Sequence, residues 1–276
     1  MKHTPPSLHD VWNALWELRE RSPLVHSITN FVVTNVTANA LLALGASPVM
    51  AHAPEEMEEI IGIASALVLN IGTLSNLDIP SMHMALETAT ARNIPVVIDP
   101  VGAGASRLRT ATALALLEKS RNACLRGNAS EILTLAGQSG KTKGVDSTVS
   151  AAAAVDAAKT LAIRYACTVS VSGEADLVTD GKRLCFIHGG SAIMPRVTGM
   201  GCSASAIAGA FAATGGTDRM LPLIAAMCVM AAAGADAARR TKGPGTFLPV
   251  LLDNLYLMDL PMLEKGAAVS YAPYDG

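Results

Sequence analysis

The chain has 276 residues, a formal net charge of -2 and 16% charged residues, below the roughly 25% of an average soluble protein. This charge argues against a nucleic-acid partner, because nucleic acids are usually bound by a strongly basic face. No linker-like run, charge block or internal repeat is evident, so we predict a single domain over residues 1–276. The low charged fraction suggests that other subunits of a homo-oligomer cover part of the surface.

Several features argue against a membrane-bound or secreted protein. The longest apolar run, residues 220–235, is shorter than the ~20 residues of a spanning helix and contains Pro222 and Gly234, so we predict a buried helix. The first ten residues lack the apolar core of a signal peptide. Five cysteines without a CxxC pair predict neither a disulfide framework nor a zinc site. We therefore expect a cytoplasmic protein with no membrane partner.

Taken in chain order, strand-like runs alternate with helical patterns. Short, mostly apolar runs predict strands buried on both faces of a parallel sheet at residues 67–71, 95–98, 123–125 and 169–171. Apolar residues at helical spacing predict helices at residues 33–44, 55–64, 79–92, 110–119, 148–164, 202–213 and 219–240. Asp180-Gly181 predicts a hairpin turn between residues 176–179 and 183–187. The alternation predicts a doubly wound α/β fold.

In such a sheet, ligands bind outside the carboxyl ends of the strands, so the residues after each strand are the first candidates for chemistry. Asp99 follows the strand 95–98 and precedes Pro100 and a Gly-rich turn. It could hold Mg²⁺, which binds few protein carboxylates and keeps water and phosphate oxygens as its other ligands. It could equally cap the turn, as an Asp-Pro pair often does.

A second candidate segment, RGNASEI (126–132), follows the strand 123–125. Arg126 carries a planar guanidinium whose geometry suits phosphate oxygens. Asn128 and Glu131 have the spacing of a capping box, which would start a helix. Alternatively, Glu131 points into a cleft and binds hydrated Mg²⁺. The residues alone leave both roles of Glu131 open.

The third segment is TGMGCSASA (198–206), in which Gly199 and Gly201 precede a helix rich in small residues. Free N–H groups at that helix start would bind an anion. Cys202 lies where a helix N-terminus would lower the pKa of a thiol from its usual value near ~8.5.

Acidic residues for Mg²⁺, an arginine for phosphate and a helix start for developing negative charge are the parts that phosphoryl transfer requires. The sequence contains no GxxxxGK[ST], GxGxxG or protein-kinase motif, which disfavours the common nucleotide-binding folds. We therefore interpret the three segments as parts of one kinase site of another fold.

These segments resemble those of hydroxyethylthiazole kinases, which belong to the ribokinase-like superfamily. The resemblance extends from about residue 22 to about residue 249, over SPLVHSITNFVVTNVTANALLALGASPVMA (22–51), LNIGTL (69–74), DPVGAGA (99–105), RGNASEI, VSGEAD (171–176), TGMGCSASA and KGPGTF (242–247). It implies a ribokinase-like three-layer α/β/α fold with a mostly parallel central sheet. It also implies ATP-dependent phosphorylation of the hydroxyl of 4-methyl-5-(2-hydroxyethyl)thiazole in thiamin biosynthesis or salvage.

The resemblance further implies roles for individual residues. Asn30, Met50 and Gly199 match positions that contact the thiazole alcohol. The family is typically a homotrimer with active sites between subunits, which would account for the low surface charge.

The nucleotide and metal positions also have counterparts in the chain. Arg126 and Ser172 match ATP-binding positions, with Ser172 in place of a more frequent threonine that also carries a hydroxyl. Asp99 and Glu131 match the acidic pair around Mg²⁺.

The catalytic positions fall in the third segment. Cys202 matches a proposed catalytic base, at a position where most ribokinase-like enzymes have aspartate. Gly199 and Gly201 match the anion-binding start of the helix, and Met200 stands between them where a smaller residue is usual.

Three other functions would fit parts of the sequence. A sister kinase could act on hydroxymethylpyrimidine or another alcohol, but the long segment 22–51 favours the thiazole. A non-catalytic thiazole-binding protein would not need intact Asp99, Glu131 and Cys202. A thiol hydrolase would need a histidine and an acidic partner for Cys202, and no such pair is apparent in the sequence.

Overall fold

The computed structural model describes residues 6–138, 151–216 and 218–272. They contain a nine-stranded sheet with the order β2-β1-β3-β4-β5-β6-β7-β8-β9. The parallel part comprises β1 (Leu24–Ile28), β2 (Ser47–Val49), β3 (Ala66–Asn70), β4 (Val96–Asp99), β5 (Cys124–Asn128) and β6 (Thr168–Ser172). The antiparallel part comprises β7 (Asp176–Thr179), β8 (Leu184–Gly189) and β9 (Ala267–Tyr271).

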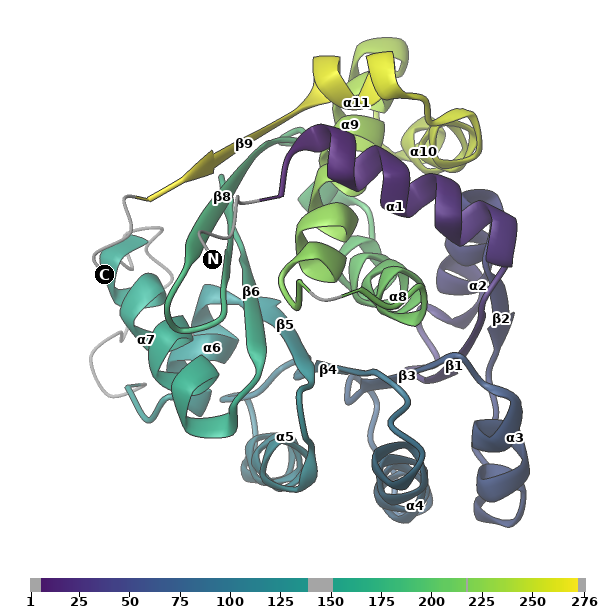
Figure 1. The fold of residues 1–276 in the computed structure, drawn as a ribbon, viewed down its shortest axis with the longest axis vertical. Helices are drawn as coiled ribbons and strands as arrows, with labels where there is room; N and C mark the ends of the chain where they lie inside the picture. Colours follow the sequence, from purple (N-terminus) through teal and green to yellow (C-terminus); the bar gives the residue numbers. More distant parts are fainter. Residues whose placement is uncertain (1–5, 139–150, 217, 273–276) are drawn as a thin grey trace.

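Helices cover both faces of this sheet, and the predicted three-layer α/β/α architecture is confirmed (Figure 1). One face carries α3 (Met57–Ile63), α4 (Asp78–Ala91), α5 (Arg107–Lys119), α6 (Ala129–Leu135) and α7 (Ala151–Tyr165). The other carries α1 (Leu8–Arg21), α2 (Thr34–Leu44), α8 (Met200–Ala213), α9 (Leu221–Arg240), α10 (Pro244–Leu257) and α11 (Leu260–Gly266). Two short 3₁₀ turns lie at Pro54–Glu56 and Met194–Arg196.

Successive side chains of a strand point to opposite faces of the sheet, and this alternation gives one hydrophobic core on each face. In β4, Val97 packs in the core on the α8 side of the sheet, whereas Val96 and Ile98 pack in the core on the opposite side. Continuing this alternation places Asp99, the last residue of β4, on the α8 side. The same argument places Asn70 there, since Val68 of β3 belongs to the α8-side core.

The predicted central strands and helices are present, as is the hairpin β7–β8, and α2 ends at Gly45. Residues 148–150, the start of one predicted helix, lie outside the described residues. After α9, the chain enters α10, which begins at Pro244. A proline fits this first helical position because its missing N–H would have no partner there.

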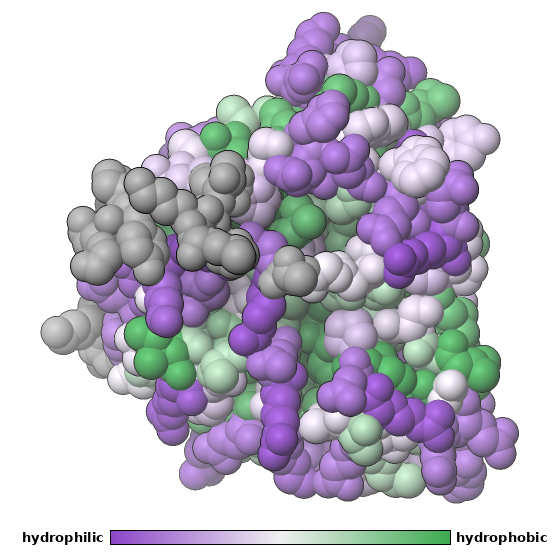
Figure 2. Space-filling model, in the orientation of Figure 1, coloured by the Kyte–Doolittle hydropathy of each residue, from purple (hydrophilic) through white to green (hydrophobic). Residues whose placement is uncertain are grey.

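Helix α9 contains the apolar run that was predicted to be a buried helix. Within the described residues it is the one helix long and apolar enough to cross a membrane, and 72% of its most apolar window is buried inside the protein. It packs against α8, α10 and α11. The core position explains its composition. On the outer surface, apolar and polar side chains are interspersed on the face that Figure 2 shows.

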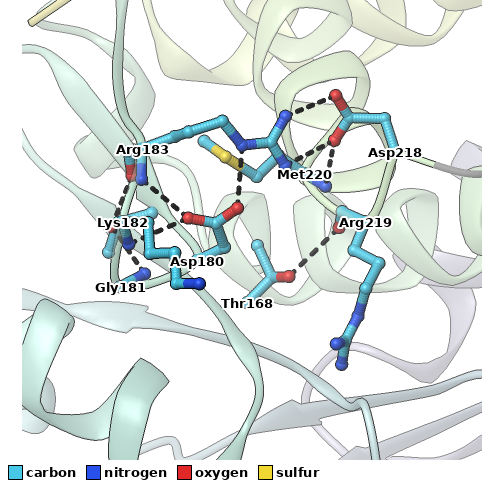
Figure 3. Close-up of polar contacts among 9 residues, drawn as sticks. Thr168, Asp180, Gly181, Lys182, Arg183, Asp218, Arg219 and Met220 are labelled. Carbon is cyan, nitrogen blue, oxygen red and sulfur yellow. Dashed lines mark hydrogen bonds and ion pairs between the residues drawn. The ribbon is translucent and has the colours of Figure 1, made fainter. Parts of the chain in front are cut away.

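An arginine clamp fixes the β7–β8 turn to the loop before α9 (Figure 3). Arg183 donates from Nε to Asp180 Oδ2 at 2.8 Å, and from Nη1 and Nη2 to the two carboxylate oxygens of Asp218 at 2.7 and 2.9 Å. Asp180 Oδ1 also accepts the backbone N–H groups of Lys182 and Arg183, at 3.0 and 2.7 Å. Burial alone would raise the pKa of Asp180, but these bonds hold it below its ordinary value.

Candidate active site

The predicted site residues gather at the edge where the parallel strands end, opposite the start of α8. The strand register pairs Asn70 with Asp99, the last residues of β3 and β4. Arg126 lies on β5, and Gly199 is the N-cap of α8. Parallel strands bring their carboxyl ends to one edge, so residues far apart in sequence meet there.

Asp99 is a buried carboxylate, only 1% exposed. Its Oδ2 accepts hydrogen bonds from Asn70 Nδ2 and Ser205 Oγ, each at 2.8 Å. Burial raises the pKa of Asp99 to about 6; Arg126 opposes the rise, and the negative charge of Glu131 adds to it. Neither hydrogen bond goes to the Gly-rich turn, so the geometry does not support the turn-capping role for Asp99.

Glu131 caps a helix and also lines a cavity. It forms the predicted capping box with Asn128, in which Glu131 Oε2 accepts the Asn128 N–H at 2.8 Å and the Glu131 N–H donates to Asn128 Oδ1 at 3.0 Å. Its other oxygen, Oε1, accepts the Gly102 N–H at 2.8 Å, which ties the turn after β4 to α6. The carboxylate also lines the cavity described below.

Arg126 brings a nearly unpartnered positive charge to the site. The residue is 9% exposed, and its Nε has no hydrogen-bond partner among the described residues. A Cβ at Gly201 would lie 2.6 Å from Arg126 Nη1, so glycine there lets the guanidinium approach the start of α8. A buried donor without an acceptor is costly, and an anionic ligand would supply one.

The start of α8 presents its backbone toward the same space. Gly199 is the N-cap with φ +85°, a left-handed conformation that glycine adopts without strain. No side chain caps this terminus, which leaves N–H groups of the first turn available to an anion. Met200, the unusual residue between the two glycines, is buried and lines the cavity.

Cys202 differs from its sequence-based expectation. Burial raises the pKa of its thiol to about 11, and the charge of Asp99 adds to the rise. Hydrogen bonds from Asn70 and Asn30 and the charge of Arg126 lower the pKa by less than this. The prediction of a lowered thiol pKa is therefore wrong, because desolvation outweighs the helix N-terminus. Among the five cysteines, Cys202 is partly exposed whereas the others are buried.

Asn30 connects the thiol to the carboxylate. Its Nδ2 lies 3.5 Å from Cys202 Sγ and 2.8 Å from Asn70 Oδ1. A continuous path of hydrogen bonds therefore runs from Cys202 through Asn30 and Asn70 to Asp99, and Ser205 of α8 closes it. Asn70 and Ser205 were missing from the predicted site, although Asn70 is a visible polar residue within the predicted strand 67–71.

A cavity of about 990 Å³ joins most of these residues. Seven of the nine predicted site residues line it: Asp99, Arg126, Glu131, Ser172, Gly199, Gly201 and Cys202. Its remaining wall includes apolar side chains of β8, α9 and the 3₁₀ turn, namely Ile187, Met194, Met227 and Met230. Asn30 contacts the cavity only through Cys202, and Met50 is half-buried outside its lining.

No group of three or more His, Cys, Asp or Glu residues with metal-site geometry occurs among the described residues. Four acidic residues line the cavity, namely Asp99, Glu131, Glu174 and Asp176.

Comparison with known proteins gives a consistent family. A sequence model of the hydroxyethylthiazole kinase family matches residues 15–260. A hydroxyethylthiazole kinase of Nitratidesulfovibrio vulgaris (strain DP4) is 58% identical over 91% of this chain and 93% of the relative. One of Methanocella arvoryzae is 46% identical over 94% of this chain and 97% of the relative.

Solved structures agree in fold. The hydroxyethylthiazole kinase of Pyrococcus horikoshii OT3 superposes with a TM-score of 0.88 and 41% identity, over 95% of this chain and 99% of that chain. A pyridoxal kinase of Staphylococcus aureus, solved with AMP-PCP and pyridoxal, gives a TM-score of 0.59 at 17% identity, over 78% and 88% of the two chains. The second likeness concerns the fold alone.

Proposed function

Because the chain belongs to the hydroxyethylthiazole kinase family, we propose that it transfers the γ-phosphoryl group of ATP to the hydroxyl of 4-methyl-5-(2-hydroxyethyl)thiazole, in thiamin biosynthesis or salvage. One observation carries the proposal. Arg126, Glu131, Asp99 and the start of α8, with Cys202, line one cavity although they come from three separate segments of the chain. Positioning and charge stabilisation are the main requirements of phosphoryl transfer.

The phosphates of ATP would lie between Arg126 and the start of α8. Arg126 offers a guanidinium with an unpartnered Nε, and the first turn after Gly199 offers backbone N–H groups. Both favour negative charge, and both act in a site partly screened from water, where such interactions are strong. Ser172 lines the same cavity and would contribute its hydroxyl to nucleotide binding.

Asp99 and Glu131 fit a hydrated Mg²⁺ ion that accompanies ATP. The raised pKa of Asp99 reports a buried negative charge that Arg126 only partly compensates, so a cation is favourable beside it. Both Glu131 oxygens already accept backbone N–H groups, so Glu131 would act through water. When bound, Mg²⁺ would neutralise charge on the phosphate oxygens.

The proton of the substrate hydroxyl would leave late in the reaction, and only the thiolate form of Cys202 could accept it. The raised pKa means that near pH 7 the thiol is almost entirely protonated, so this thiolate is scarce in the free enzyme. The transition state of phosphoryl transfer is loose, and the attacking alcohol then needs little help from a base. Gly199 and Gly201 leave room for the transferred group at the helix start.

The thiazole would bind between subunits of a homotrimer. Met50 is half-buried outside the lining of the cavity of one chain, and Phe31, beside Asn30, is 69% exposed. A neighbouring subunit would cover these apolar side chains and complete the thiazole site with Asn30, Met50 and Gly199. The expected solution mass, measured by light scattering, is three times the chain mass of 28.4 kDa.

The decisive measurement is ADP release with Mg²⁺ and ATP, compared between the hydroxyethylthiazole and hydroxymethylpyrimidine. We expect turnover with the thiazole and much less with the pyrimidine. Preference for the pyrimidine would assign a sister kinase, and thiazole binding without ADP release would assign a binding protein. Product formation in the absence of ATP would contradict phosphoryl transfer altogether. In the cell we expect the protein in the cytoplasm.

A further inference from the structure

Besides Asn30, the hydrogen-bond path between Cys202 and Asp99 contains two residues that line no part of the cavity, Asn70 and Ser205. They are 2% and 0% exposed. We propose that both are positioning residues for phosphoryl transfer, which act through Asp99 and, by way of Asn30, through Cys202. This inference rests on the function proposed above.

The orientation of the Asn70 amide follows from its neighbours. Its oxygen lies 3.0 Å from the backbone N of Gly72, and a backbone N–H can only donate, so this atom must be the acceptor Oδ1. The Nδ2 group then faces Asp99 Oδ2, at 2.8 Å, as a donor. Asp99 Oδ2 is therefore the acceptor of a hydrogen bond donated by Asn70, and this bond favours the charged carboxylate over the neutral acid.

Asn70 also orients the residue next to the thiol. Its Oδ1 accepts a hydrogen bond from Asn30 Nδ2 at 2.8 Å, and the same Nδ2 lies 3.5 Å from Cys202 Sγ. The oxygen of Asn30 is held by the Val32 N–H at 3.2 Å. With both ends of its amide fixed, Asn30 directs an N–H group at the sulfur.

Ser205 makes the second bond to the same carboxylate oxygen, from Oγ at 2.8 Å. It lies three residues after Cys202 on α8, and residues at this spacing are neighbours on one face of a helix. The helix that presents the thiol therefore also holds the carboxylate. A displacement of α8 would move both groups together relative to the strand ends.

The test replaces each positioning residue and measures kcat and KM separately. In Asn70→Ala we expect kcat to fall about 100-fold, because a small misplacement of reacting groups has an effect of this size. In Ser205→Ala, which removes one of two donors to Asp99, we expect a fall of about tenfold. The KM for the alcohol in Ser205→Ala, and in both variants the affinity for ADP measured by calorimetry without added metal, should stay within about threefold, since neither side chain lines the cavity.

Ser203→Ala is the matched control. Ser203 lies on the same helix, is 1% exposed, and its Oγ has no hydrogen-bond partner among the described residues. This variant should keep the kcat of the original protein. All variants are assayed well below their melting temperatures.

Two results would overturn the inference while leaving the proposed kinase intact. One is a kcat in both variants equal to that of Ser203→Ala. The other is a loss of ADP affinity in step with kcat, which indicates a structural role only. If Asn70→Ala does not fold, Ser205→Ala decides by the same criteria. An original protein that releases no ADP with any alcohol would instead contradict the proposed function.

Discussion

Two arginines, Arg126 on β5 and Arg183 beside the β7–β8 turn, show how the same side chain can serve folding or chemistry. Arg183 donates to both oxygens of Asp218 and to Asp180, in a clamp between a hairpin and the loop before α9. Arg126 is more deeply buried, yet its Nε has no partner among the described residues. A fully bonded cation stabilises the fold, whereas an unbonded one is a cost that a phosphate ligand can offset.

The largest effect should come from Arg126. Replacing Arg126 with Met should lower kcat/KM for ATP about 10³-fold, the upper range for losing one charge-stabilising donor. The free energy of unfolding of the ligand-free protein should change little, because no protein hydrogen bond of Nε is lost. Steady-state kinetics and urea unfolding measure the two quantities. A strongly destabilised variant with normal kinetics would show that Arg126 stabilises the fold, as Arg183 does, and would contradict its proposed role in phosphate binding.

Asp99 should also serve activity at the expense of stability, and the dependence of stability on pH should reveal this. Its pKa is raised from 3.8 to about 6 in the folded state, so the folded protein binds more protons between these values and its stability falls as the pH rises through them. At pH 7.5, Asp99→Asn should therefore increase the free energy of unfolding by up to about 3 kcal/mol while activity falls. The gain should vanish near pH 4, as followed by urea unfolding at several pH values.

Asp236 provides the control with the opposite sign. Burial alone would raise the pKa of Asp236, but Arg239 and Arg240 lower it, so its ionisation favours the folded state. Asp236→Asn should be neutral or slightly destabilising at pH 7.5. A stabilising Asp236→Asn, or a stability gain in Asp99→Asn that does not depend on pH, would contradict the assigned cause.

Substitution of the clamp residue Arg183 should change stability but not activity, the opposite of what we expect for Arg126. Arg183→Met should lower the free energy of unfolding by about 2 kcal/mol, since bonds to charged groups are lost and two carboxylates remain. Turnover of the folded protein should be unchanged. Thermal unfolding and ADP release test this, with Arg239→Met, at a more exposed ion pair, as a control of smaller effect.

The smallest effect should be at the thiol. Cys202→Ala should lower kcat only about tenfold, below the ~10²–10⁴-fold range of general-base help, because the thiol is protonated at neutral pH and the proton leaves late. Cys202→Asp should keep or increase kcat, since a carboxylate is a stronger base at neutral pH than this thiol. A folded but inactive Asp variant would count against the role of Cys202.

The sequence was sufficient for the centre of the fold and for the charged residues of the site. Mostly apolar runs identified β3 and β4, and the rule that ligands bind at strand ends led to Asp99. The outer elements were missed for physical reasons. In β1, His26 and Ser27 interrupt the apolar pattern, and β2 has only three residues. The strand β9 is stabilised by pairing with β8, which no local pattern of residues reveals.

The site residues that were missed also divide into those that a local sequence pattern could reveal and those that depend on packing. Asn70 could have been found, since it is a polar residue at the end of an apolar run. Ser205 could not, because its importance depends on which side of α8 faces the sheet. The pKa of Cys202 was predicted with the wrong sign because burial, a property of the packed protein, outweighs the local effect of a helix start.

The path from Cys202 to Asp99 also bears on how the protein is made. A ribosome delivers Asn30, Asn70 and Asp99 well before it delivers α8, so during synthesis the carboxylate lacks Ser205. The sheet face that α8 covers, with Val25, Val68 and Val97, would meanwhile be uncovered. Nascent chains that stop before α8 would therefore carry an exposed apolar face, and they should be substrates for chaperones and proteases.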